Sequence, residues 1–433
     1  MIHKGIEVID YTSTGLGVCK VEGFPYFIQY AKIGDVIDFE VIKTENNYAI
    51  GKLLELENNS ECPHYLKCNG CSIAHLDYDE QLTFKHNVVK NLLSKFKIST
   101  RLEAINANYK QFEYRNKVVM PFVADKNIKV GYFKPGSKDI EPIKDCRLFL
   151  NKTNILIETI LNLLNEMDES VYDYKFNQGN LKHLIIKQSN KDLAYMIIIV
   201  TKDGTLNNKH ILIDNLKEEF NIDSVVINEN PDDYKQQGLK NYIVYRKEFI
   251  VNEMNNIRFK VTPNSFYQVN NYQAKELMNY AINLINLNNK TVLDAFCGTG
   301  LISLLVSKQA SKVYGIDSNF ESIEIAKENA KFNCINNVTF KASKVEKETR
   351  NLEQSNFFDV VFVDPPRKGV DKDFISLLLK KQPENIIYIS CNQSTLCRDL
   401  NLLSTKFNVI STKPFDMFPN THHIESVTLL QRK

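Results

Sequence analysis

The last third of the chain alternates between short apolar runs and amphipathic segments, and this alternation limits the fold most strongly. Strands that alternate with helices form a parallel sheet covered by helices on both faces. Such a sheet presents its functional groups at the carboxyl ends of its strands. Three motifs follow apolar runs here: Asp294-Ala295-Phe296-Cys297-Gly298-Thr299-Gly300, Val363-Asp364-Pro365-Pro366-Arg367 and Ser390-Cys391-Asn392. We therefore predict an α/β fold with a C-terminal doubly wound, Rossmann-like sheet.

The length and composition describe a globular protein of more than one domain. The chain has 433 residues, of which 43 % are hydrophobic and 24 % are charged, so we expect two or three domains. The first residues lack a basic start followed by an apolar core, and no stretch reaches the roughly 18 apolar residues of a membrane span. We expect a cytoplasmic protein with no membrane partner, and nothing in the sequence indicates an obligate protein partner.

Changes in composition divide the chain into three predicted domains. Residues 1–57 contain short alternating runs separated by glycines, which predict an OB-like β-barrel. Residues 58–258 form a mixed α+β central domain, in which a helix over 78–97 carries an apolar stripe that we expect to pack on the C-terminal domain. Residues 259–433 form the domain with the doubly wound sheet.

A basic and aromatic stretch lies in the central domain. Between residues 110 and 138 there are seven Lys or Arg residues, two acids and several interleaved aromatic residues. Basic charge neutralises phosphates and aromatic rings stack on unpaired bases, so the stretch is a candidate RNA-binding surface. A solvated strand face explains the same composition, and the two alternatives stay open here.

The loop from Asp294 to Gly300 is a candidate cofactor site. Its glycines allow a ligand to approach the backbone beside a helix N-terminus. Asp317 ends the next strand, 19 residues after Gly298, close to the spacing of about 20 residues for an acid that binds ribose hydroxyls. A dinucleotide loop would need a third glycine where Ser303 stands, and an acid ahead of the glycines suits an ammonium group. We therefore favour S-adenosylmethionine over NAD.

Asp364 and Cys391 face the same predicted sheet edge. Two prolines restrict the loop after Asp364, which would hold its carboxylate toward the cofactor and an acceptor ring. A thiolate at Cys391 and a carboxylate base at Glu425 are the pair needed to methylate C5 of uracil, because attack at C6 makes C5 nucleophilic and a base then removes the C5 proton. A buried, unreactive thiol is the alternative for Cys391, and His423 is the competing base.

Four further cysteines form a candidate metal site. Cys62, Cys68 and Cys71 have the spacing C-x5-C-x2-C, and Cys146 lies far downstream. Nine cysteines, an odd number, in a cytoplasmic chain argue against a disulfide framework. Four thiolates bind either a zinc ion or a 4Fe-4S cluster, and this spacing matches neither common pattern.

These motifs resemble those of the bacterial RNA uracil-5-methyltransferases, most closely the 23S ribosomal RNA type with an N-terminal TRAM barrel and an iron-sulfur cluster. The resemblance covers nearly the whole chain, including Tyr114-Arg115-Asn116-Lys117 and Ser265-Phe266-Tyr267-Gln268-Val269-Asn270. It implies a class I methyltransferase sheet, with Cys391 as nucleophile and Glu425 as base. It also implies that S-adenosylmethionine is contacted by Gln268, Phe296, Asp317 and Asp364. The implied cluster ligands are Cys62, Cys68, Cys71 and Cys146.

Two positions depart from the family pattern. Gln393 replaces the proline common after Ser-Cys-Asn, which we expect to loosen the nucleophile loop, and Leu301 stands where some members have a cofactor-contacting Asn. The barrel and the four cysteines favour 23S rRNA over tRNA as substrate. An RNA N-methyltransferase and a non-catalytic RNA-binding protein are the rival classes, and both leave the pairing of Cys391 with Glu425 unexplained.

Overall fold

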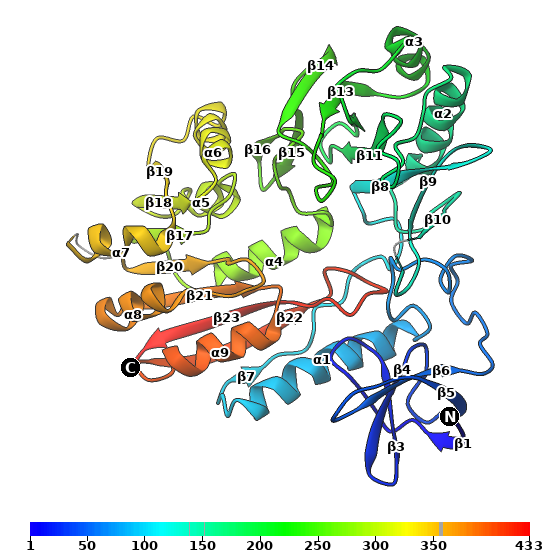
Figure 1. Ribbon diagram of the computed structural model, residues 1–433. Helices are drawn as coiled ribbons and strands as arrows, with labels where there is room; N and C mark the ends of the chain where they lie inside the picture. The colour runs from blue at the N-terminus through cyan, green and yellow to red at the C-terminus, as the bar shows by residue number, and fades with distance from the viewer. Residues whose placement is uncertain (138, 151, 355–357) are drawn as a thin grey trace.

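The computed structural model describes residues 1–137, 139–150, 152–354 and 358–433. Lys138, the last residue of the basic stretch, lies outside the described residues. Three large sheets organise the chain, and Figure 1 shows them as a barrel-like sheet, a central sheet and a C-terminal sheet. None of the helices in the described ranges combines the length and apolar character that a membrane crossing needs.

The N-terminal sheet has six strands in the order β1-β5-β6-β4-β3-β2. Its core consists of aliphatic and aromatic side chains, and it is closely packed at Gly51, where an added Cβ would lie 2.5 Å from both the Ile28 side chain and the Phe39 ring. Glycine is therefore required there by close approach. The strands are β1 (Ile2–Glu7), β2 (Asp10–Tyr11), β3 (Gly17–Val21), β4 (Phe24–Ile28), β5 (Val36–Thr44) and β6 (Ala49–Leu53).

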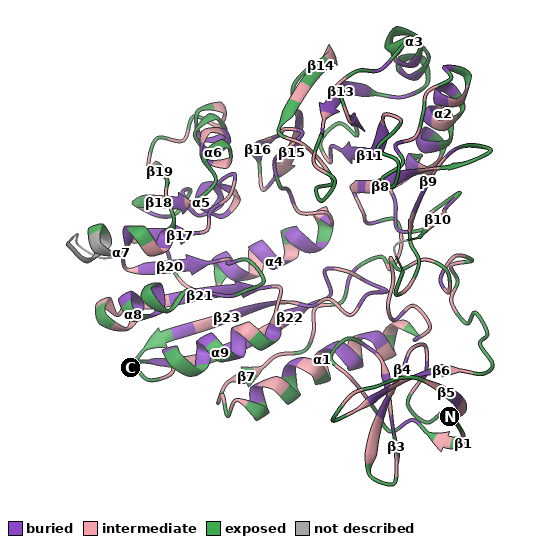
Figure 2. Cartoon of the chain, viewed as in Figure 1, coloured by how far each residue is buried: buried purple, intermediate pink, exposed green. Residues whose placement is uncertain are grey.

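The central sheet has seven strands in the order β10-β9-β8-β11-β12-β13-β14. Helices α2 and α3 pack on one face, and the other face joins the core of the C-terminal domain. Every residue of β11 and β12 is buried (Figure 2), as expected for strands covered on both faces. The elements are β8 (Lys117–Asp125), β9 (Asn127–Phe133), β10 (Ile140–Pro142), α2 (Thr153–Glu166), β11 (Leu181–Gln188), β12 (Tyr195–Thr201), α3 (Lys209–Glu219), β13 (Ile222–Glu229) and β14 (Lys240–Arg246).

The C-terminal sheet has eight strands in the order β19-β18-β17-β20-β21-β23-β22-β7. The neighbouring strands β19, β18, β17, β20 and β21 are parallel, whereas β23 runs antiparallel to both β21 and β22. A two-stranded ribbon of β15 (Ile250–Met254) and β16 (Ile257–Val261) precedes it. The strands are β7 (Arg101–Leu102), β17 (Thr291–Ala295), β18 (Lys312–Asp317), β19 (Val338–Ala342), β20 (Val360–Val363), β21 (Asn385–Ser390), β22 (Phe407–Phe415) and β23 (Glu425–Arg432).

Helices cover both faces of this sheet, so the predicted doubly wound α/β class is confirmed. One face carries α4 and α5, and the other carries α8, α9 and the earlier helix α1. The helices are α4 (Asn271–Asn283), α5 (Leu301–Val306), α6 (Phe320–Phe332), α7 (Val345–Gln354), α8 (Lys372–Lys381) and α9 (Gln393–Leu403).

Helix α1 (Tyr78–Lys95) belongs to the C-terminal core although it precedes the central sheet in sequence. Asp77 and Glu80 form a capping box at its start, which satisfies two free backbone N–H groups. Val89 and Leu93 pack in the core of the C-terminal sheet. The fully buried ammonium group of Lys85 pairs with the fully buried carboxylate of Asp416 at 2.5 Å, which ties α1 to the loop after β22.

Candidate active site

Five candidate residues meet at one edge of the C-terminal sheet. Asp317 ends β18, Asp364 follows β20 and Cys391 follows β21, all at carboxyl ends of parallel strands. Asp294 lies one residue before the end of β17. Glu425 begins β23, and because β23 is antiparallel to β21, its first residue lies at this same edge. The topology therefore gathers groups that are far apart in sequence.

The backbone of the loop after β17 is held by hydrogen bonds to the carboxylates of Asp294 and Asp317. The N–H of Gly298 donates to Asp317 Oδ2 at 3.0 Å, and both the N–H and the hydroxyl of Ser303 donate to Asp294 Oδ2, at 2.8 and 2.5 Å. Phe296 has a φ of 67°, a left-handed conformation that is strained for an aromatic residue. Strain of this kind is concentrated at ligand-binding turns.

The surroundings of the Asp294 carboxylate favour the binding of a cation. Its Oδ1 is buried and has no hydrogen-bond partner among the described residues. Burial raises its pKa to about 7, with the Asp364 carboxylate adding to the shift and the Ser303 hydroxyl opposing it. Burial likewise raises the pKa of Asp364 to about 7. A bound ammonium or sulfonium group would relieve both desolvated acids, so this edge fits the charge of S-adenosylmethionine.

Gln268 lies in the segment between β16 and α4. The side chain of Asn116 donates to the Gln268 carbonyl at 2.9 Å, while the Gln268 amide makes no hydrogen bond among the described residues. The buried Lys187 ammonium group donates to the carbonyls of Thr262, Pro263 and Ser265 at 2.8 to 2.9 Å. The central sheet therefore fixes this segment and leaves the amide of Gln268 available.

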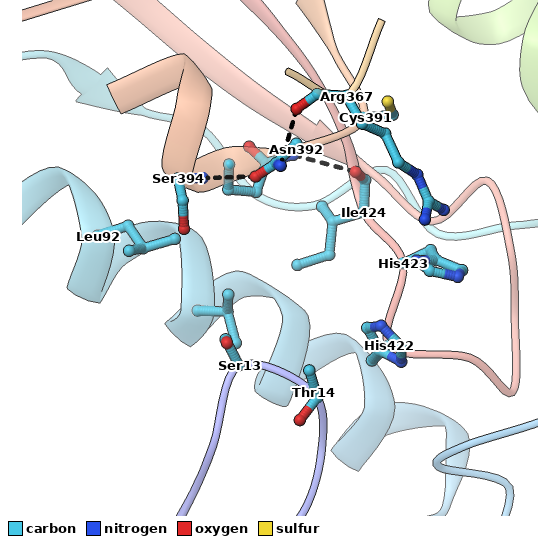
Figure 3. A pocket seen from close by; sticks show the side chains of 12 residues that line it. Ser13, Thr14, Leu92, Arg367, Cys391, Asn392, Ser394, His422, His423 and Ile424 are labelled. Carbon is cyan, nitrogen blue, oxygen red and sulfur yellow. Dashed lines mark hydrogen bonds between the residues drawn. The ribbon is translucent and has the colours of Figure 1, made fainter. Parts of the chain in front are cut away.

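Cys391 lines a cavity of about 240 Å³ at the end of β21. Figure 3 shows Cys391, Arg367 and His423 around this cavity, with Ser13 and Thr14 of the barrel across from them. The pKa of the Cys391 thiol is raised to about 11, first by burial and then by the carboxylates of Glu425 and Asp364, whereas Arg367 lowers it. The thiol is thus close enough to both acids to respond to their charge.

Glu425 is acted on by two of the same neighbouring charges as Cys391. Its pKa is raised to about 8, first by burial and then by the Asp364 carboxylate, whereas the Arg367 cation lowers it. A carboxylate with a pKa near the working pH is suited to take and release a proton. His423, the competing base, has its pKa lowered to about 4 by burial and by the neighbouring charges of His422 and Arg367, so it is neutral and weakly basic.

Asn392 connects the segment of Cys391 to the loop of Asp364. Its side-chain oxygen accepts from the backbone N–H groups of Ser394 and Thr395 at the start of α9, and its amide donates to the Arg367 carbonyl at 2.9 Å (Figure 3). The N-cap of α9 therefore also anchors the Asp-Pro-Pro-Arg turn.

All four cysteines of the candidate metal site line a second cavity, of about 250 Å³. The pKa values of Cys68 and Cys71 are raised by burial and by the other thiols, and that of Cys146 is raised to about 12 for the same reasons. Among the residues that the structure describes, no group of three or more His, Cys, Asp or Glu side chains is arranged around a single metal ion. The structure therefore brings the four thiols together at one cavity.

The remaining cysteines stand apart from both cavities. Cys19, Cys297 and Cys397 are buried and Cys334 is exposed.

Sequence reasoning did not identify two groups of the site. The charge of Arg367 acts on both Cys391 and Glu425, and the side chain of Gln393 bonds to both of their strands. For Arg367, its position directly after Pro365 and Pro366 of the Asp364 loop could have indicated a role in the site. Gln393 stood out in the sequence only as a departure from the family pattern, and nothing there indicated its hydrogen bonds.

Known proteins resemble this chain over most of its length. The sequence model described as tRNA (Uracil-5-)-methyltransferase matches residues 77–433. An uncharacterized RNA methyltransferase of Clostridium tetani is 36 % identical over 429 residues, covering 96 % of this chain and 93 % of that protein. A second one, of Staphylococcus epidermidis, is 35 % identical and covers 99 % of this chain and 97 % of its own length.

A solved structure extends the likeness to the whole chain. It is the Pyrococcus abyssi tRNA (uracil-54, C5)-methyltransferase in complex with S-adenosyl-L-homocysteine, which has a TM-score of 0.80, 26 % identity, and coverage of 99 % of this chain and 100 % of that one. The resemblance inferred from the motifs is confirmed by these matches. The chain belongs to the tRNA (uracil-5-)-methyltransferase family, a family of S-adenosylmethionine-dependent RNA methyltransferases.

Proposed function

We propose that the protein methylates C5 of a uridine in RNA through a covalent adduct between Cys391 and C6 of the base. The observation that carries this proposal is the position of Cys391 and Glu425, which lie one residue beyond the Ser390–Ser426 pair that ends the β21–β23 ladder, close enough for the Glu425 carboxylate to raise the pKa of the thiol. Neither an N-methyltransferase nor a non-catalytic RNA-binding protein needs a thiol and a carboxylate in this arrangement.

Each residue has one role in the proposed reaction. The Cys391 thiolate attacks C6 and forms an S–C6 bond, which makes C5 nucleophilic. Bound S-adenosylmethionine supplies the methyl group that C5 takes. Glu425 then removes the C5 proton, the C5–C6 double bond re-forms, and the S–C6 bond breaks to return the thiolate. Glu425 is the better base, because His423 has a pKa lowered to about 4.

The cofactor would be held by the residues at the carboxyl edge. We assign the ammonium group to the unpaired Oδ1 of Asp294, the ribose to Asp317, and further contacts to Gln268, Phe296 and Asp364. Asp294 was not among the residues that the resemblance implied. Its buried and unpaired oxygen supports adding it.

The proposed target is a uridine of 23S rRNA, on the strength of the resemblance of the barrel and the four cysteines. A tRNA is the second candidate. The solved tRNA enzyme matches 99 % of this chain, so its likeness extends over the barrel, and the barrel no longer separates the two substrate classes.

Nucleoside analysis tests this function. Cells with and without the gene are compared by mass analysis of 5-methyluridine in separated 23S rRNA and tRNA, with re-expression of the native protein or of Cys391→Ala. Loss of 5-methyluridine from one fraction, restored only by the native protein, is the expected result. Unchanged 5-methyluridine with loss of an N-methylated nucleoside, or no change at all, would support a rival class.

We further propose that Cys62, Cys68, Cys71 and Cys146 hold a 4Fe-4S cluster. Each thiolate of such a cluster binds a different iron, so its ligands stand farther apart than around one zinc ion. The cavity that the four thiols share and the resemblance of their spacing to the family pattern support this choice. Anaerobically purified protein should be brown and contain equal amounts of iron and sulfide, and Cys68→Ser should lose them. Colourless protein that contains zinc would contradict the cluster.

A further inference from the structure

The nucleophile and the base lie at the end of a strand ladder. The last residue pair between β21 and β23 is Ser390 with Ser426. Cys391 is the residue after Ser390, and Glu425 is the residue before Ser426. Both reacting groups are therefore one position beyond the final β21–β23 pair, where the ladder itself no longer fixes one strand relative to the other.

The side chain of Gln393 spans this end of the ladder. Its Nε2 donates to the carbonyl of Ser390 at 3.3 Å and to the carbonyl of Ile424 at 3.0 Å. Its Oε1 accepts from the hydroxyl of Ser426 at 2.7 Å. One amide thus holds the residue before the nucleophile and both residues that flank the base.

The orientation of this amide is determined by its partners. Backbone carbonyls only accept hydrogen bonds, so the nitrogen must face Ser390 and Ile424, which leaves the oxygen to face Ser426. Gln393 is 6 % exposed, and its partners Ser426 and Ile424 are 0 % and 4 % exposed. Water cannot readily replace these bonds, and loss of the amide would leave buried groups unpaired.

The same residue departs from the family pattern, in which a proline follows Ser-Cys-Asn. Gln393 is the first residue of α9, a position where proline fits because its missing N–H would be unpaired in any case. We expected the exchange to loosen the nucleophile loop. The structure shows the opposite, because the lost ring constraint is replaced by three side-chain bonds.

We propose that Gln393 is a positioning residue that sets the place of Glu425 relative to Cys391 and so controls release of the methylated base. This inference rests on the proposed function. Gln393 touches neither RNA nor cofactor in this scheme, and acts only through Ser390, Ile424 and Ser426. Cys391 is held by β21 and by the N-cap of α9, and Glu425 by its pairing with Phe415 of β22, so loss of the bridge should change the position of one relative to the other. Adduct formation needs only Cys391, whereas adduct breakdown needs Glu425 beside the base that Cys391 holds, so breakdown should be slowed more.

The test measures adduct formation and adduct breakdown separately. In single-turnover reactions with a uridine-containing RNA substrate, Gln393→Met keeps the side-chain volume and removes all three bonds. Methylated enzyme–RNA adduct should form at close to the native rate and break down about tenfold or more slowly, because general-base catalysis contributes about 10²–10⁴-fold. The pH dependence of breakdown should also move, while the KM for RNA stays unchanged.

Two further variants make the result decisive. Gln393→Leu also removes the bridge and places a strong helix former at the start of α9, so it should slow breakdown in the same way even if the Met variant folds poorly. Gln188→Met makes the same chemical change at another buried glutamine, which lies in β11, and should leave breakdown unchanged.

The outcomes separate this inference from the proposed function. If the native enzyme forms no adduct at all, the covalent function fails whatever Gln393 does. If the native enzyme forms an adduct and a folded Gln393 variant releases its product at the native rate, only the positioning role is overturned. Equal slowing of formation and breakdown in both variants would also overturn it, because the side chain would then act on the fold or on Cys391.

Discussion

At the scale of single residues, the charge of Arg367 acts on both reacting groups. Its cation lowers the pKa of Cys391 and of Glu425, and therefore favours the thiolate and the carboxylate that the reaction needs. Arg367→Gln should raise both pKa values and move the pH profile of turnover to higher pH. We expect activity at neutral pH to fall by about threefold to tenfold, since one pKa unit is a tenfold change.

A pH series of initial rates checks this prediction. Arg101→Gln, which removes an exposed cation on β7, is the matched control and should keep the native profile. A profile that stays in place for Arg367→Gln, with only the affinity for RNA reduced, would show that Arg367 binds phosphate and does not tune the acids.

Asp294 should couple cofactor binding to proton release. Its pKa is raised to about 7 by burial, so near neutral pH part of the protein carries a protonated carboxyl. A bound cation favours the ionised form, so binding should release protons and tighten as the pH rises through 7. Calorimetry of S-adenosylmethionine binding in buffers of different ionisation heat measures this release.

The variant Asp294→Asn isolates the contribution of this carboxyl. It should weaken binding by about 1.5–3 kcal/mol, the value of a hydrogen bond to a charged group, and reduce the proton release. Unchanged proton release would assign the titration to Asp364, whose pKa is also about 7.

The positions of the acidic and thiol side chains at the sheet edge were predictable from the sequence. Asp317, Asp364 and Cys391 were predicted at one sheet edge because each follows an apolar run, and the structure places them there. The hydrogen bonds of the Gln393 side chain were not predictable, because they depend on which residues end the β21–β23 ladder. That register is a tertiary property, and no local spacing in the sequence encodes it.

At the scale of elements, the segment that leads into Glu425 is held by the cysteine loop. The N–H groups of Ser72 and Ile73 donate to the Asn420 carbonyl at 3.0 and 3.1 Å, and the N–H of His422 donates to Ser72 Oγ at 2.8 Å. Asn420 has a φ of 68°, which asparagine tolerates better than most residues. These bonds connect the candidate cluster loop directly to the segment that leads into Glu425.

Ser72→Ala should loosen this connection without removing a catalytic group. It removes the hydroxyl that bonds to His422, at a cost of about 1 kcal/mol or more in unfolding free energy. Hydrogen exchange of residues 419–424 should become faster, while adduct formation at Cys391 is retained. Ser60→Ala removes a bond within the same cysteine segment and should leave that exchange unchanged; equal exchange in both variants would contradict the connection.

Helices and long strands were predictable from the sequence, whereas the short strand at the edge of the C-terminal sheet was not. The helix expected over 78–97 is α1 (Tyr78–Lys95), since its apolar stripe is long. Strand β7 (Arg101–Leu102) pairs with β22, but two residues carry no periodicity. The buried Gln81 and Lys85 on α1 also look like surface residues until their partners Asn420 and Asp416 are known.

At the scale of the whole molecule, the barrel and the C-terminal sheet form facing walls of the same cavity. Ser13 and Thr14 of the barrel line the cavity that contains Cys391. The barrel is fixed there by Tyr11, which packs on Phe84 of α1, and by Gly15, where an added Cβ would lie 2.4 Å from Ile73. The sequence predicted the barrel but gave no sign of this contact, which joins loops distant in the chain.

The central claim is that Cys391 attacks the target base, and a trapping experiment tests it most directly. RNA that carries 5-fluorouridine at the target should form a stable covalent complex in the presence of S-adenosylmethionine, because Glu425 cannot remove fluorine as it removes a proton. Peptide mapping should place the RNA on Cys391. Cys397→Ala, which changes a buried thiol on α9, should trap normally, and Cys391→Ala should trap nothing. A complex that forms equally with Cys391→Ala, or methylation by that variant at the native rate, would contradict the account.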